Sequence, residues 1–224
     1  MASLKRNHPD IVRILRLVKY ELEGQASHLL GKLSPARRRR VAELKRLTGL
    51  KLHIASGGSR LPGWVNIDVS NAADVKMDLR RPLPLASGSA RMIFCEHFCD
   101  HISHPHGIRH FMSECYRLLE PGGVARFVLH DAGDLMKAYV AGDRSYFKTA
   151  EQDEEPIVAV NMLFRFNDFH QFLYDYPYFS KLLGEAGFTT VGRCAYQVST
   201  TEGLAMDFEH SSREVMSMYI EAEK

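Results

Sequence analysis

The hydrophobic pattern of the first fifty residues predicts a helical arm. Apolar residues recur at helical spacing over residues 11–22, which is typical of an amphipathic helix. Ser34 and Pro35 suit the N-cap and the first position of a second helix. We expect this second helix to end near Gly49, so that the arm occupies residues 1–50.

The region after the arm is expected to form an α/β domain over residues 51–224. Helices are predicted at 107–119 and 179–186, and apolar runs bounded by turn residues mark the strands. The expected strands are 52–54, 64–67, 73–79, 90–94, 124–129, 188–196 and 215–222. This alternation predicts a mainly parallel sheet with helices on both faces, in which the last two strands form an antiparallel edge pair.

One long segment, about residues 132–162, lies between predicted strands without a clear pattern of its own. It mixes apolar and polar residues and carries a charged stretch over residues 151–155. Segments of this length often serve as lids or substrate-binding insertions, so we predict an insertion here.

Composition and cysteine usage favour a cytoplasmic protein with one core. Of 224 residues, 45% are hydrophobic and 25% are charged, which is ordinary for a globular domain of this size. No apolar run approaches the ~18 residues of a membrane span, and the N-terminus lacks the apolar core of a signal peptide. The four cysteines contain no CxxC pair, which predicts reduced thiols.

The charge of the chain is strongly asymmetric. Residues 1–51 carry 13 Lys/Arg and 4 Asp/Glu, a net +9, whereas the other 173 residues carry a net −7. The arm could be a solvated helical face, or it could contact an anionic membrane surface, an acidic partner or nucleic acid. No aromatic residue interleaves with the arginine run 37–40, which makes nucleic acid an unlikely partner. A homodimer formed through the arm stays open.

The segment KLHIASGGSRLPGWVNID, residues 51–68, is the most informative part of the chain. It predicts a strand, a turn that contains Gly57 and Gly58, and a second strand that ends at Asp68. In open α/β sheets such glycines let the backbone approach a nucleoside, and such a carboxylate accepts hydrogen bonds from the ribose hydroxyls.

Polar residues also follow two later strands. Glu96 and His97 come after the strand 90–94, and His130 and Asp131 end the strand 124–129. Ligands of parallel sheets bind at the carboxyl ends of the strands, so these side chains should lie at the same edge as the glycine turn.

Four segments resemble class I S-adenosylmethionine (SAM)-dependent methyltransferases, most closely a small bacterial group found among polysaccharide biosynthesis proteins. These segments are LHIASGGSRLPGWVNID, ADVKMDLRRPLPL, FCEHFCDHI and RHFMSECYRLLEPGGVARFVLHD, and LLGEAGF later in the chain matches as well. The resemblance implies a Rossmann-like seven-stranded sheet and SAM as the cofactor. It assigns cofactor contacts to the glycine turn, the strand-end acid, an adenine-flanking pair and an acid beneath the sulfonium. The residues are Ala55, Ser56, Gly57, Gly58, Asp68, Asp78, Leu79 and Glu96.

Two positions depart from the family pattern. Ala55 stands where the family has the first glycine of its loop, and Asp100 stands where the family motif has glutamate. If residue 55 requires a positive φ, its methyl group costs about 1 kcal/mol. If it lies in the β region, the alanine is harmless.

The candidate catalytic residues are His97, His130, His170 and Asp131. A histidine with a pKa near neutrality can remove the proton of an acceptor hydroxyl, and Asp131 could orient or replace it. His97 and His101 are four residues apart, as in zinc sites on helices, but the H-E-x-x-H pattern is absent and no metal site is predicted.

The expected function is therefore methyl transfer from SAM to a hydroxyl of a sugar, such as a glycan, or of another small polar metabolite. The altered loop leaves a second hypothesis, a non-catalytic scaffold or binding protein with the methyltransferase fold. A weaker one is an RNA-directed methyltransferase that uses the basic arm.

Overall fold

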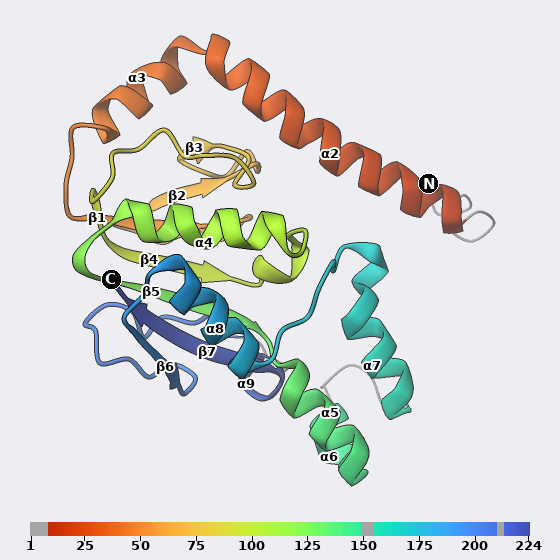
Figure 1. Ribbon diagram of the computed structural model, residues 1–224. Coiled ribbons are helices and arrows are strands. Elements are labelled where there is room, and N and C mark those ends of the chain that lie inside the picture. The colour runs from red at the N-terminus through yellow and green to blue at the C-terminus, as the bar shows by residue number, and fades with distance from the viewer. Residues whose placement is uncertain (1–8, 149–154, 210–212) are drawn as a thin grey trace.

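The computed structural model describes residues 9–148, 155–209 and 213–224, and its centre is a seven-stranded sheet (Figure 1). The strand order is β3-β2-β1-β4-β5-β7-β6. The strands are β1 (Leu50–Ile54), β2 (Val65–Asp68), β3 (Val75–Lys76), β4 (Ala90–Glu96), β5 (Leu119–His130), β6 (Thr190–Cys194) and β7 (Ser217–Glu223). The first five are parallel, whereas β7 runs antiparallel to both β5 and β6. The predicted mainly parallel sheet with an antiparallel edge pair is confirmed.

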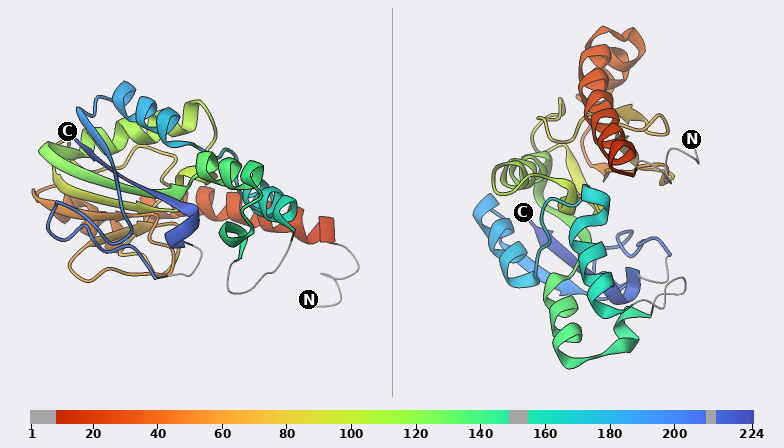
Figure 2. Two further views of the ribbon diagram at one scale, coloured as in Figure 1. Left: turned by 90° about the horizontal axis from the view of Figure 1, so that it is seen from below. Right: turned by 90° about the vertical axis from the view of Figure 1, so that its right-hand side faces the viewer.

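The two faces of the sheet are covered differently. Helices α4 (His106–Leu118) and α8 (Tyr176–Ala186) lie side by side on one face (Figure 2, left). On the other face, Trp64 and Leu204 from loop segments pack against Phe94 and Tyr219 of the sheet. The connections from β1 to β2 and from β2 to β3 contain no helix, so loops cover much of this face.

A buried arginine fixes the loop that covers this second face. Arg126 of β5 is fully buried and forms ion pairs with Asp207 at 2.5 Å and Glu221 at 2.8 Å. Its guanidinium also donates to the carbonyls of Ala195 and Val198. The segment between β6 and β7 is therefore tied to the middle of the sheet, because an unpaired charge at this depth would be costly.

The arm consists of α2 (Pro9–Leu33) and α3 (Pro35–Leu44). Ser34 caps α3 as predicted, since its side chain accepts a hydrogen bond from the Arg37 backbone N–H. The helix ends at Leu44, earlier than expected. The predicted apolar stripe of α2 is 47–62% exposed, at Ile11, Ile14, Leu15, Val18 and Leu22.

The predicted insertion is largely helical and extends beyond the carboxyl edge of the sheet (Figure 1). It contains α5 (Ala132–Ala141), α6 (Arg144–Phe147) and most of α7 (Pro156–Arg165). These helices share a small separate core with Met216 of α9 (Arg213–Met216). Two short 3-10 helices, η1 (Cys99–His101) and η2 (Phe166–Asp168), complete the described elements.

All four cysteines are free thiols. Among the described helices, none combines the length and the apolarity that crossing a bilayer requires.

Candidate functional site

A cavity of about 270 Å³ opens at the carboxyl edge of β1, β2 and β4. Six of the predicted site residues line it, and these are Ala55, Gly57, Asp68, Asp78, Leu79 and His97. Its far end is walled by Phe98, His101 and Phe169. The cavity therefore joins the predicted nucleoside-binding residues to one predicted catalytic side chain, His97.

The glycine loop is held close to the end of β2. The backbone N–H groups of Ala55 and Ser56 both donate to the carbonyl of Ile67. Ala55 has φ +61° and Gly57 has φ +52°, so both residues lie in the left-handed region. The alanine that departs from the family pattern is therefore strained by about 1 kcal/mol. A Cβ at Gly57 would meet no atom within 4 Å, so the loop faces open space.

Asp68, at the end of β2, is fixed from both sides. Its Oδ2 accepts a hydrogen bond from the Gly57 N–H at 3.1 Å, and its Oδ1 accepts one from the Ser70 N–H at 2.7 Å. Each carboxylate oxygen has a second lone pair, so both can still accept a hydrogen bond from a ribose hydroxyl.

Asp78 is held by a different set of partners. Its side chain is 5% exposed, and Arg80 reaches it through Nε at 2.9 Å and through its second guanidinium nitrogen at 2.9 Å. Burial alone would raise the pKa of Asp78, but the hydrogen bonds from Arg80 outweigh it and leave the pKa below its ordinary range. Arg80 also donates to Glu21 of α2 at 2.6 Å, so the arm is connected to this wall of the cavity.

Three of the predicted cofactor residues do not line the cavity. Ser56 is buried, and Gly58 lies in the loop beyond it. Glu96 is 8% exposed, and its carboxylate accepts a 3.5 Å hydrogen bond from the Phe208 N–H in the loop layer of the opposite face. In a strand successive side chains point to opposite faces, so Glu96 follows Phe94 to that face.

Four histidines form a cluster beside the cavity, and two of them, His97 and His101, line it. The ring centroids of His97 and His130 are 4.5 Å apart, those of His130 and His170 are 5.3 Å apart, and those of His170 and His101 are 4.9 Å apart. Three predicted catalytic residues thus come together from the ends of β4 and β5 and from the segment after η2. His97 has φ +48°, and backbone strain of this kind is concentrated at functional sites.

The hydrogen bonds of two of these histidines fix their tautomers. Nδ1 of His170 bonds the carbonyl of Leu163, and Nδ1 of His101 bonds the carbonyl of Phe169 at 3.1 Å. A carbonyl only accepts, so each Nδ1 carries the proton and each neutral ring keeps a lone pair on Nε2. Burial lowers the pKa of His170 and lowers that of His101 to about 4.

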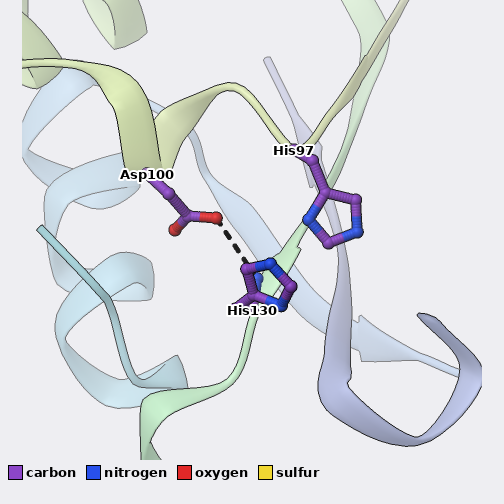
Figure 3. Close-up of side chains that lie close together, drawn as sticks. All are labelled: His97, Asp100 and His130. Carbon is purple, nitrogen blue, oxygen red and sulfur yellow. Dashed lines mark hydrogen bonds between the residues drawn. The ribbon is translucent and has the colours of Figure 1, made fainter. Parts of the chain in front are cut away.

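Asp100 lies beside His97 and His130 (Figure 3), and it is completely buried. Its Oδ2 accepts a 3.5 Å hydrogen bond from the His130 backbone N–H, whereas its Oδ1 has no hydrogen-bond partner within the described residues. Burial raises the pKa of Asp100 to about 8. From sequence, Asp100 was noted only as a replacement for the family glutamate.

Asp131 has a structural role instead of the expected catalytic one. Its side chain caps α5 by accepting hydrogen bonds from the N–H groups of Gly133 and Asp134, and it forms an ion pair with Arg193. These contacts hold the carboxylate in place and occupy it, so we do not count Asp131 among the candidate proton acceptors.

A second cavity, of about 440 Å³, lies between α3 and the segment after β3. It shares Met77 and Asp78 with the first cavity, but its other polar side chains are basic: Arg37 and Arg38 of α3, Lys45 and Arg81. Although it is larger, neither a glycine loop nor a histidine lines it, so the smaller cavity is the candidate site.

The smaller cavity fits SAM. The fixed carboxylate of Asp68 suits the ribose, Asp78 and Leu79 form a wall suited to the adenine, and the open space in front of Gly57 suits the methionine part.

Residues 61–127 match the sequence model of a methyltransferase domain family. A SAM-dependent methyltransferase from Archaeoglobus fulgidus shares the fold with a TM-score of 0.51 and 13% identity, over 93% of this chain and 99% of that one. A SAM-dependent methyltransferase from Thermotoga maritima, described as a possible histamine N-methyltransferase, has a TM-score of 0.50 and 14% identity, over 93% and 96%. No curated protein matches the chain.

At 13% and 14% identity, these two structures show that the fold is shared and nothing more. The family match is independent of them and covers β2, β3, β4 and most of β5, which carry much of the cavity wall. The match, the shared fold and the residues that line the cavity agree in supporting a class I SAM-dependent methyltransferase.

Proposed function

We propose that the protein transfers a methyl group from SAM to a hydroxyl of a sugar or another small polar metabolite. The observation that carries the proposal is the tautomer of His170, whose Nε2 lone pair belongs to a buried ring in the histidine cluster. When bound, SAM supplies an electrophilic methyl group on its sulfonium.

The chain's own contribution begins with positioning. Asp68 and Asp78 are preorganised by hydrogen bonds that exist before any ligand binds, which reduces the entropy lost on binding. Fixing the cofactor against the histidine end brings the two reactants into the geometry that an in-line displacement needs.

The proton of the acceptor hydroxyl moves to Nε2 of His170. As that ring becomes cationic, the Leu163 carbonyl stabilises it through the Nδ1–H hydrogen bond. His97 and His130 offer further polar contacts for the neighbouring oxygens of the acceptor. General-base catalysis by a positioned histidine contributes about 10²–10⁴-fold to a rate.

The character of the far end supports a small polar acceptor. Imidazoles provide hydrogen-bonding groups there, and Phe166 stacks on His170 with ring centroids 4.8 Å apart. This mixture of aromatic surface and a few convergent polar groups is typical of pockets for small ligands. The sugar class itself rests on the resemblance to polysaccharide biosynthesis proteins.

The test uses untagged protein, SAM with a labelled methyl group, and a panel of monosaccharides, nucleotide sugars and other small hydroxylated compounds. His170→Gln should lower kcat by at least about 10²-fold, because glutamine cannot accept the proton, while the Kd for SAM stays unchanged. His106→Gln, at an exposed position, is the control. An unchanged kcat in His170→Gln would remove His170 as the base, and a methylated nitrogen in the product would overturn the hydroxyl acceptor.

A further inference from the structure

Three potential metal ligands from separate segments converge beside the cavity. His97 follows β4, Asp100 lies in η1, and His130 ends β5, yet one potential ligand atom from each lies within 4.8 Å of the other two. Figure 3 shows the three side chains turned toward one shared space. The pair that sequence spacing suggested, His97 and His101, is not the pair that shares this space.

We propose that His97, Asp100 and His130 bind a divalent transition-metal ion of the Zn²⁺ type. Two imidazoles and one carboxylate are a ligand set that Zn²⁺ and Fe²⁺ use in proteins, and a three-residue set leaves coordination positions open for another molecule.

The surroundings of Asp100 favour a cation. The side chain is 0% exposed, and none of the described lysines or arginines forms an ion pair with it. A buried carboxyl oxygen without a partner destabilises the fold, because its lost hydration is not replaced by another interaction. A metal ion coordinated by Oδ1 would supply the missing partner at the point where the two histidines approach.

The three ligand atoms are near one another, but they are farther apart than in a zinc site with its ion bound. In a tetrahedral zinc site with ligand bonds of ~2.1 Å, neighbouring ligand atoms are about 3.4 Å apart, against at most 4.8 Å here. Rotation of the imidazoles toward Asp100 would close this difference. The Ser217 hydroxyl lies 3.3 Å from Nε2 of His97 and can orient that ring, as supporting groups do around metal ligands.

The role of the ion, unlike its binding, rests on the proposed function. An ion at this point would bind acceptor oxygens directly and make a bound hydroxyl easier to deprotonate. Expansion to five-coordinate geometry would give the ion two open positions, which would favour acceptors that carry two adjacent oxygen atoms, such as vicinal diols. His170 is outside the ligand set and stays available as the proton acceptor.

The test is calorimetric titration of untagged, chelator-treated full-length protein with Zn²⁺, together with the metal content of the protein as purified. The wild type should bind one ion per chain. The nearly isosteric Asp100→Asn and the variant His130→Gln should each weaken Zn²⁺ binding at least about tenfold. His106→Gln, an exposed histidine outside the cluster, should bind as the wild type does.

SAM titration and thermal unfolding of the same variants separate the possible failures. Wild-type SAM affinity in Asp100→Asn would show that the variant is folded and that the lost site is the metal site. Absence of saturable Zn²⁺ binding in a wild type that binds SAM would overturn the metal proposal and leave the proposed function standing. Equal Zn²⁺ affinity in wild type and Asp100→Asn would overturn it as well.

Discussion

The two ends of the cavity differ in how the protein satisfies the hydrogen-bonding groups of their carboxyl side chains. At the adenine end Asp68 and Asp78 have their oxygens engaged by backbone N–H groups or by Arg80. At the histidine end one oxygen of Asp100 has no hydrogen-bond partner among the described residues, and burial lowers the pKa values of His101 and His170.

The difference separates recognition from chemistry. A carboxylate that is already hydrogen-bonded is rigid, which suits recognition of a nucleoside. Neutral imidazoles and a carboxyl whose pKa is raised to about 8 can exchange protons or accept a cation near neutral pH. Changes at the adenine end should therefore alter binding and stability, whereas changes at the histidine end should alter turnover.

The strongest test of this division at the adenine end is Asp68→Ala. The variant removes the acceptor for the ribose hydroxyls and the acceptor for the Gly57 N–H. We expect the Kd for SAM, measured by calorimetry, to rise more than tenfold, which corresponds to more than about 1.4 kcal/mol.

The matched control is Asp74→Asn, in the turn that follows β2. Its carboxylate bonds Asn66 and Arg60 and does not line the cavity, so SAM affinity should stay as in the wild type. Unchanged affinity in Asp68→Ala would remove the ribose assignment from the adenine end.

The second prediction concerns acid stability. The folded-state pKa of Asp78 is lowered, so its stabilising contribution is present above the unfolded pKa near 3.8 and is lost as pH falls through the folded value. In urea unfolding, the wild type should exceed Asp78→Asn by about 1 kcal/mol at pH 7, a modest figure because Arg80 is partly exposed.

This advantage should hold from pH 7 down to about pH 4 and shrink below that pH. If the stability difference between the wild type and Asp78→Asn instead fell between pH 7 and 5, a titrating histidine would be its cause. The assignment of this stabilisation to the Asp78 carboxylate would then be wrong.

Much of the fold was predictable because its signals are local. Ser34 and Pro35 mark the start of α3, and the apolar runs mark the strands, of which β4 and β5 are parallel because the helix α4 connects them. Asp68 could be placed at the ligand edge because it directly follows a strand. The length of the helical arm and the loop layer opposite α4 depend on tertiary packing and were not visible in the pattern.

Only those site residues that follow directly on a strand could be placed from the sequence. His97 and His130 end neighbouring strands, so their approach follows from the sheet. Asp100 lies near them because η1 places it there, and a 3-10 helix of three residues is too short to give a periodic sequence pattern. Strand alternation could have placed Glu96 correctly, because it points to the same face as Phe94, away from His97.

A third prediction tests whether the arm belongs to the adenine end. Gly24 of α2 is buried, and a Cβ there would lie 2.7 Å from a guanidinium nitrogen of Arg80 and 3.1 Å from Oδ2 of Asp78. Gly24→Ala should therefore destabilise the protein or weaken SAM binding a few-fold, despite the higher helix propensity of alanine.

Gly184 of α8 is the matched control, because it is exposed and a Cβ there would meet no atom within 4 Å. Gly184→Ala should stabilise by up to about 1 kcal/mol. Equal stabilisation by both alanines in thermal unfolding would show that α2 does not pack on Arg80 and Asp78.

The smallest expected effect distinguishes strain from contact within the glycine loop. Ala55 and Gly57 both have positive φ, but Ala55 carries a methyl group that packs against the core, whereas a Cβ at Gly57 would touch nothing within 4 Å. Gly57→Ala should thus cost about 1 kcal/mol through backbone strain alone. Ala55→Gly should gain less than about 1 kcal/mol, because relief of strain is partly offset by lost packing and a more flexible unfolded chain. Both are measured by urea unfolding, with SAM affinity as the second readout. If Ala55→Gly were clearly destabilising, the methyl contact would outweigh the strain, and the alanine would be a packing residue of the loop.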